Sequence, residues 1–183
     1  MKRKINMLVL IGKQGSGKTT LINEFEKDQK YKRVVGCTTR PRRGNEVEGQ
    51  DYYFYTKEEF IRSATENNFL EYQEHRGWFY GTLKESIVKE DEKENVLILT
   101  YKGYKKLKEE HPNVKAIYIK VDFYSRFKKV LETRSDKLEA VRREIKDMID
   151  FSFITKDKDI YTIKNKHYMY STNMLKKKIE QFF

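Results

Sequence analysis

The chain has 183 residues, 38% of them hydrophobic, which is long enough for one domain with a full core. No apolar run reaches the roughly 18 residues that cross a bilayer, and the single cysteine allows no internal disulfide, so we expect a cytoplasmic protein without a membrane partner. The net charge of +11 suits nucleic acid or small anions, and because lysines alternate with glutamates we expect a solvated surface with anion sites and no nucleic-acid partner.

The first predicted elements are a strand, a glycine-rich turn and a helix. The apolar run 5–11 is typical of a buried strand, and Leu21, Ile22 and Phe25 lie on one face of a helix. Between them stands Gly12-Lys13-Gln14-Gly15-Ser16-Gly17-Lys18-Thr19, which has the G-x-x-x-x-G-K-T spacing of a P-loop. The motif binds phosphate in this strand–turn–helix context, so a nucleotide site is predicted here.

Each position of the P-loop has a predicted role. The glycines allow backbone N–H groups to curl around phosphate oxygens, and the helix dipole adds positive potential. Lys18 is expected to reach the terminal phosphates of ATP, and the Thr19 hydroxyl to hold Mg²⁺. The expected nucleotide contacts are Gly12, Gly15, Ser16, Gly17, Lys18, Thr19 and Thr20.

After this helix, short strands and turns alternate and predict a small inserted lobe. An arginine-rich turn is expected at 40–45, where Pro41 disfavours a helix. A helix is expected from 57 to 67, with Thr56 and Glu59 forming a capping box. The predicted strands of this region are 33–39, 52–55, 69–72 and 77–82.

From Leu83 onwards, longer helices and strands alternate. This alternation predicts an α/β fold with a parallel sheet and helices on both of its faces. The expected order is helix 83–92, strand 95–99, helix 104–111, strand 114–121, helices 125–134 and 138–151, strand 166–170 and helix 172–182.

The arginine-rich turn is a second candidate anion site. Arg40 and Arg43 lie on it, and arginine binds phosphate through two parallel N–H groups. Tyr52 and Tyr80 can each add a phenolic donor. Taken alone, such arginines are more simply explained as solvated, and such tyrosines as part of a core.

The segment 38–54 resembles the nucleotide-monophosphate-binding signature of guanylate kinases, T-T-R-x-x-R-x-G-E-x-x-G-x-D-Y-x-F, with Asn45 in place of one glycine. The resemblance continues at 69–72 and 80–82, which are similar to the family's F-[IL]-E and Y-G-[ST] elements. Together with the P-loop it covers roughly residues 5–90. It implies a three-layer P-loop kinase fold with a parallel central sheet, an inserted lobe that binds the nucleoside monophosphate, and a helical lid.

On this resemblance, residues 1–183 form a single guanylate-kinase-like domain. The implied core is 1–35, 83–124 and 150–183, the implied monophosphate-binding lobe is 36–82, and the implied lid is 125–149.

The resemblance also implies an activity: phosphoryl transfer from ATP, with Mg²⁺, to a nucleoside monophosphate, GMP or dGMP first. Lys18 and the lid arginines Arg134 and Arg143, or Arg142 in place of Arg143, would neutralise the migrating group. Glu71 would accept from N1–H and the amine of guanine, and Thr82 would donate to O6. The implied acceptor-site residues are Arg40, Arg43, Tyr52 and Tyr80 at the phosphate and Glu71 and Thr82 at the base.

Four features depart from the family pattern. Two aspartates on a central strand read here as Ile98 and Thr100, and Gly36 stands where a base-contacting serine is usual. An early lid arginine reads as Val130, and an Asn-Asp pair after the last strand reads as Ser171-Thr172-Asn173. Because isoleucine accepts no hydrogen bond, guanine selectivity is expected to be weaker.

These departures leave two alternatives to a GMP kinase. One is a kinase for another nucleoside or deoxynucleoside monophosphate with an altered base pocket. The other is a guanylate-kinase-like module that binds protein, although such modules usually lose the P-loop lysine and glycines that are present here. Both a monomer and a homodimer are compatible with the sequence.

Overall fold

The computed structural model describes residues 6–88, 93–133, 151 and 153–182. Its larger sheet has five strands in the order β2-β7-β1-β8-β9, and every neighbouring pair is parallel. The parallel central sheet expected from the sequence is therefore confirmed. The strands are β1 (Met7–Ile11), β2 (Tyr31–Arg33), β7 (Glu94–Ile98), β8 (Lys115–Lys120) and β9 (Ile160–Lys164).

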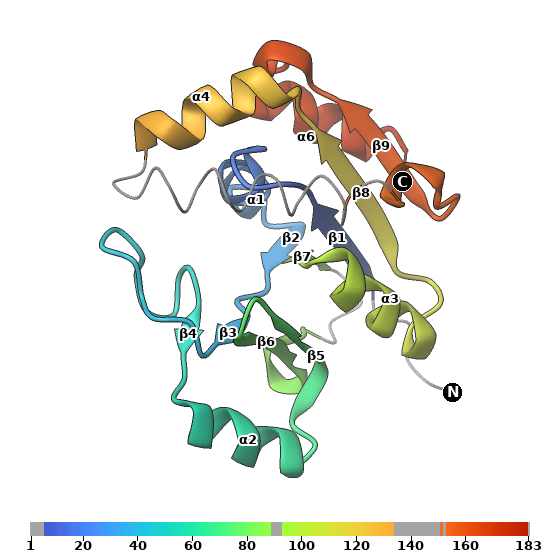
Figure 1. Cartoon of the computed structure of the whole chain (residues 1–183). Helices are drawn as coiled ribbons and strands as arrows, with labels where there is room; N and C mark the ends of the chain where they lie inside the picture. Colours follow the sequence, from blue (N-terminus) through green and yellow to red (C-terminus); the bar gives the residue numbers. More distant parts are fainter. Residues whose placement is uncertain (1–5, 89–92, 134–150, 152, 183) are drawn as a thin grey trace.

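Helices cover both faces of the larger sheet, so its central strand β1 is buried at all five positions. Alternate residues of β1 enter a core cluster with α3 (Tyr101–Glu110). The intervening residues enter a second cluster with α1 (Lys18–Glu26) and α6 (Thr172–Glu180). The result is the predicted three-layer arrangement, which Figure 1 shows in its upper part.

A smaller sheet of four strands lies below the larger one in Figure 1. Its order is β4-β3-β6-β5, and β5 and β6 form an antiparallel hairpin. Helix α2 (Lys57–Thr65) covers it and stacks Phe60 on the rings of Phe69 and Phe79. The expected capping box at the start of α2 is present. The strands are β3 (Cys37–Thr38), β4 (Tyr53–Phe54), β5 (Phe69–His75) and β6 (Trp78–Leu83).

The strand predicted at 33–39 is in fact divided between the two sheets. Arg33 ends β2 of the larger sheet, and Cys37 begins β3 of the smaller one. Between them the backbone N–H of Val34 still donates to the Val96 carbonyl, whereas the Gly36 carbonyl accepts from Tyr53. This segment is where the chain passes from one sheet to the other.

The helix predicted at 83–92 was wrong. Leu83 is the last residue of β6 and pairs with Phe69, so it continues the hairpin. Among the described residues 84–88, one 3₁₀ turn follows, η1 (Lys84–Ser86). Strand pairing therefore outweighed a helical sequence pattern at this point.

The last strand was also predicted in the wrong place. Residues 166–170 contain the 3₁₀ turn η3 (Lys166–Tyr168), and the last strand is β9. Asn165 follows β9 directly, and its buried amide pairs with both backbone groups of Tyr170. The residues that follow the last strand are therefore Asn165 and Lys166 rather than 171–173, and the Asn-Asp pair is absent there too. The remaining elements are α4 (Phe123–Thr133) and η2 (Ile154–Lys156).

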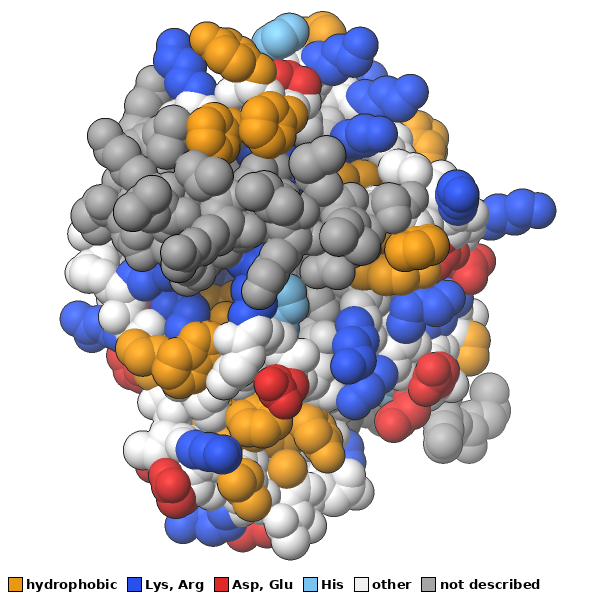
Figure 2. Space-filling view, in the orientation of Figure 1, with side chains coloured by type: hydrophobic (Ala, Val, Ile, Leu, Met, Phe, Trp, Pro, Cys, Tyr) orange, Lys and Arg blue, Asp and Glu red, His pale blue; other side chains and the backbone are white. Residues whose placement is uncertain are grey.

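Basic side chains are spread over the visible face of the molecule rather than gathered in one patch, as Figure 2 shows. No helix within the described ranges is long and apolar enough to cross a membrane. The predicted helix 138–151, apart from its last residue, and the three lid arginines lie outside the described residues, as does the side chain of Val130.

Candidate active site

One cleft of about 780 Å³ runs between the two sheets. It brings together residues from the P-loop, the arginine-rich turn, the β5–β6 hairpin and the end of β7. Of the sequence-predicted residues, Ser16 is a buried member of the P-loop and Thr20 is exposed on α1, and neither lines the cleft. The predicted residues that line the cleft are Gly12, Gly15, Lys18, Thr19, Arg40, Arg43, Tyr52, Glu71, Tyr80 and Thr82.

The P-loop takes a backbone path that requires glycine. Gly15 and Gly17 have φ values of 76° and 88°, in the left-handed region that side chains disfavour. At Gly12 a Cβ atom would lie 2.5 Å from Ser16 Oγ and 3.2 Å from the carbonyl oxygen of Ile119. The glycine spacing recognised in the sequence thus has a steric cause at each position.

The Lys18 ammonium group lies across the loop. Its Nζ donates to the carbonyl oxygens of Gly12 at 2.6 Å and Lys13 at 3.0 Å. Thr19, in the first turn of α1, is exposed and lines the cleft. The ammonium and the hydroxyl are therefore both close to where the loop's N–H groups would hold a phosphate.

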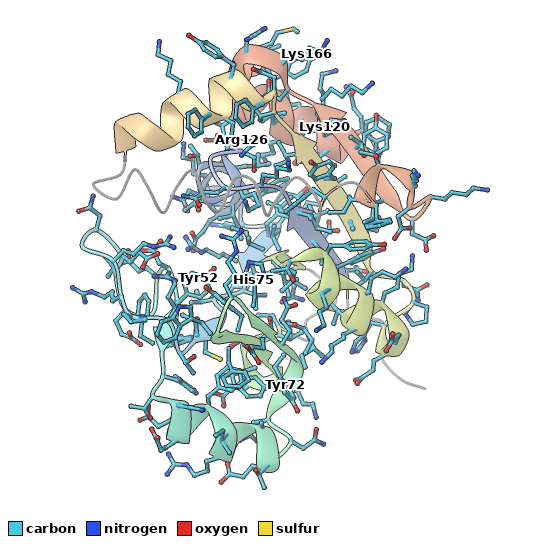
Figure 3. All side chains as sticks on the ribbon, viewed as in Figure 1. Tyr52, Tyr72, His75, Lys120, Arg126 and Lys166 are labelled. Carbon is cyan, nitrogen blue, oxygen red and sulfur yellow. The ribbon has the colours of Figure 1, made fainter. Side chains whose placement is uncertain are left out.

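Two side chains that were not predicted as site residues anchor the P-loop from outside. The Tyr168 hydroxyl donates to the Gly15 carbonyl at 2.6 Å, and Arg126 Nη1 donates to the Gln14 carbonyl at 3.3 Å. Arg126 is only 2% exposed. Figure 3 shows it near α4, whereas Tyr52 lies lower, on the side of the smaller sheet. By engaging loop carbonyls, these donors help to keep the loop's N–H groups directed at the cleft.

The arginine-rich turn is organised by Glu46, which stands in the signature at 38–54 but was given no predicted role. Arg40 Nη2 donates to both oxygens of Glu46, at 2.7 and 3.0 Å, and Arg43 Nη1 lies 3.9 Å from the nearer one. Burial opposes the ionisation of Glu46, but hydrogen bonds from Arg40 and from the Arg43 backbone outweigh it and lower its pKa. Glu46 thus holds both arginines in the cleft wall.

The two predicted tyrosines lie beside this pair. The rings of Tyr52 and Tyr80 meet edge to face with centroids 6.1 Å apart, and the Arg40 guanidinium lies 5.7 Å from the Tyr52 ring centre. Figure 3 shows Tyr52 and His75 on the small-sheet side, with Tyr72 turned toward α2. Two arginines and two phenols therefore share one wall of the cleft, a donor set suited to a phosphate.

Glu71 is a buried carboxylate with one unsatisfied oxygen. Its Oε1 accepts from the Thr82 hydroxyl at 2.8 Å, whereas Oε2 is buried with no hydrogen-bond partner. Burial raises the pKa of Glu71 to about 7. A buried acceptor of this kind suits a ligand that supplies N–H donors. The Thr82 proton, which we expected to donate to the base, is directed at Glu71 here.

The residues around Glu71 explain two of the departures noted in the sequence. At Gly36 a Cβ atom would lie 3.1 Å from the Gly81 carbonyl, so a serine would fit there only if that strand moved. Thr100 caps α3 and accepts from the buried amide of Gln73. Gln73 was not predicted as a site residue, although the alternation of side chains along β5 puts it on the same face as Glu71.

The site's fit to a metal depends on oxygen donors at the P-loop. No group of three or more His, Cys, Asp or Glu side chains converges within the described part of the chain. Mg²⁺ prefers oxygen ligands and keeps several waters when it binds through nucleotide phosphates. The Thr19 hydroxyl, which is exposed at the cleft, is an oxygen ligand of that kind.

Comparison with known proteins places these features in one family. The family model described as guanylate kinase matches residues 4–169. The chain is 37% identical to the guanylate kinase of Clostridium acetobutylicum over 76% of this chain and 68% of that protein. It is 32% identical to that of Thermotoga maritima, over 86% and 81%. The crystal structure of guanylate kinase from Anaplasma phagocytophilum shares the fold, with a TM-score of 0.73 at 22% identity, covering 100% of this chain and 86% of the other.

Proposed function

The chain belongs to the guanylate kinase family of nucleoside-monophosphate kinases, and from this premise we propose that it transfers a phosphoryl group from ATP to GMP or dGMP. The observation that carries the proposal is a cleft with the P-loop on one wall and an arginine–tyrosine anion site on another. A donor phosphate at the first site would face an acceptor phosphate at the second. We assign residues 36–82 to the acceptor lobe and 125–149 to the lid.

The proposed reaction needs positioning and positive charge rather than a covalent intermediate. An oxygen of the acceptor phosphate attacks the γ-phosphorus of ATP in line, and the bond to the β–γ bridging oxygen breaks. Lys18 would leave the loop carbonyls and neutralise the migrating group. Arg40 and Arg43 would hold the acceptor phosphate, with Tyr52 and Tyr80 as further donors. Arg134 and Arg143 are proposed to add charge from the lid.

Mg²⁺ would be held by the Thr19 hydroxyl, phosphate oxygens and water. When bound, it neutralises charge on the β- and γ-phosphates. The contribution of this chain is the hydroxyl itself, placed in the first turn of α1 immediately after Lys18.

At the other end of the cleft, Glu71 supports guanine as the acceptor base. Guanine presents N1–H, with the 2-amino group beside it, toward a carboxylate that has an unpaired oxygen. Adenine lacks N1–H and presents its amine elsewhere, so it would leave that oxygen unpaired.

A screen of nucleoside monophosphates with ATP and Mg²⁺ tests the proposal. We expect ADP formation with GMP and dGMP, and little with AMP, CMP or UMP. Strict preference for another base would show that the chain is a kinase with an altered base pocket. Lack of turnover with every acceptor, together with tight binding of a phosphorylated peptide, would instead favour the protein-binding alternative.

A further inference from the structure

Gln73 is a buried amide at the base end of the cleft for which the proposed reaction has no role. It follows Glu71 by two residues on β5, so both side chains leave the strand on the same face. Gln73 is only 5% exposed and lines the cleft. Because glutamine is mostly a surface residue, an amide buried against a ligand cleft is informative.

The partner of this amide holds it in place without fixing its orientation. Gln73 Nε2 donates to Thr100 Oγ1, and the same oxygen accepts the backbone N–H of Gly103 at 3.1 Å. A hydroxyl accepts through its lone pairs and also donates its own proton. Thr100 can therefore pair with either the nitrogen or the oxygen of the Gln73 amide. With Nε2 paired to Thr100, the carbonyl end of the amide is available to a ligand.

The Gln73 amide also lies beside the unsatisfied oxygen of Glu71. A Cβ atom on Gly103 would be 2.9 Å from Glu71 Oε2 and 3.1 Å from Gln73 Nε2, so both groups approach one point over the first turn of α3. Glycine leaves that point clear. Ile98, which lines the same part of the cleft, packs against a core cluster and has no hydrogen-bonding side-chain group.

We infer that Gln73 is a specificity-determining residue that accepts a hydrogen bond from the 2-amino group of the acceptor base, while Glu71 accepts from N1–H. This rests on the proposed function, since it requires a guanine in the acceptor site. Only one oxygen of Glu71 is without a hydrogen bond, because the other accepts from Thr82. Guanine has two adjacent donors, so the second needs a neighbouring acceptor, and the carbonyl end of the Gln73 amide supplies it.

Inosine monophosphate isolates this contact, because hypoxanthine keeps N1–H and O6 but has no 2-amino group. The experiment measures kcat/KM for GMP and for inosine monophosphate with ATP, in the wild type, in Gln73→Leu and in Gln50→Leu. Gln50 is exposed and outside the cleft lining, so it is a matched control. We expect Gln73→Leu to lower kcat/KM for GMP about tenfold and to leave that for inosine monophosphate within about twofold. Thr100→Val should lower the ratio of kcat/KM for GMP to kcat/KM for inosine monophosphate, but by less than Gln73→Leu does.

The outcomes separate this role from a structural one. A parallel loss with both acceptors, or an unchanged ratio in Gln73→Leu, would overturn the inference while GMP turnover upheld the proposed function. If the wild type phosphorylates neither acceptor, both fail. Gln73→Met, closer in volume, replaces the leucine variant if that does not fold. If neither variant folds, the wild-type ratio decides: equal use of the two acceptors would overturn the inference.

Discussion

The P-loop and the base pocket lie in one cleft but are built from different parts of the chain. The P-loop is made by the backbone of eight consecutive residues, and its glycines are fixed by φ angles and close contacts. The base pocket is made by side chains from separate elements: Glu71 and Gln73 on β5, Thr82 on β6 and Thr100 before α3. A backbone site tolerates few substitutions, whereas a side-chain site can change its ligand by single replacements.

The two regions also differ in electrostatics. At the P-loop a cation, Lys18, rests on carbonyl oxygens that it can exchange for phosphate. At the base pocket a carboxylate is kept from water and only partly hydrogen-bonded, so its pKa is about 7. The P-loop is thus ready for any nucleoside triphosphate, while the base pocket gains a partner only when a ligand with N–H donors arrives.

The largest effect is expected at the P-loop. Lys18→Ala removes the charge closest to the migrating phosphoryl group and should lower kcat by roughly 10²- to 10³-fold. Steady-state assays with ATP and GMP would measure it, with Lys27→Ala, at the exposed C-terminal end of the same helix, as the control. Nearly full kcat in Lys18→Ala would show that the P-loop is not the donor site.

The second prediction separates binding from stability at Glu71. Glu71→Gln keeps the shape of the side chain but cannot accept from both the Thr82 hydroxyl and the guanine N1–H as a carboxylate does. We therefore expect kcat/KM for GMP to fall by about 10²-fold. The same substitution should make the folded protein more stable at neutral pH, because the folded-state pKa of Glu71, about 7, lies above the ordinary value of 4.5. Ionising Glu71 destabilises the folded protein increasingly as the pH rises from 4.5, and in full above 7.

Thermal unfolding of Glu71→Gln and wild type at two pH values checks that stability effect. The variant should melt at a higher temperature than the wild type at pH 8, and the difference should shrink toward pH 5. Glu74→Gln, at the next exposed acidic position on the same strand, should show no such pH-dependent gain. A variant less stable than the wild type at pH 8 would contradict the buried, partly unsatisfied carboxylate.

A third, smaller effect is the pH dependence of acceptor binding. Below pH 7 Glu71 holds a proton that guanine must displace, so KM for GMP should be about tenfold higher at pH 6 than at pH 8. The phosphate of GMP also titrates near pH 6, and Glu71→Gln measures that contribution alone. If KM for GMP changed equally with pH in the wild type and in Glu71→Gln, Glu71 would already be ionised from pH 6 to pH 8.

Local features of the fold and site could be predicted from the sequence. The P-loop and the capping box of α2 depend on residues a few positions apart, and the structure has both. The anchor from Tyr168 to Gly15 spans 153 residues, and the bond between Gln73 and Thr100 spans 27. No periodicity or spacing reports such contacts, because they arise only when separate elements pack.

The misplaced last strand has a similar cause. Residues 166–170 are aromatic-rich and read as a strand, but His167 and Tyr168 adopt positive φ values that strands exclude. The true strand, β9, buries only Ile160 and Ile163 among its five residues. Its pattern is weak, and its pairing with β8 across the sheet, rather than its own sequence, makes it a strand.

The smallest predicted effect concerns Glu46, which lies on the acceptor side but acts only through the arginines. Glu46→Gln weakens the ion pair with Arg40 and leaves the guanidinium less firmly held in the cleft wall. KM for GMP should rise about threefold, because the arginine is less well positioned, while kcat stays unchanged, because Glu46 contacts no reacting atom. Inorganic phosphate should raise the melting temperature of this variant less than that of the wild type or of Glu58→Gln on exposed α2. An unchanged KM together with an unchanged response to phosphate would mean that Arg40 does not bind the acceptor phosphate, and the second anion site would then rest on Arg43 and the two tyrosines.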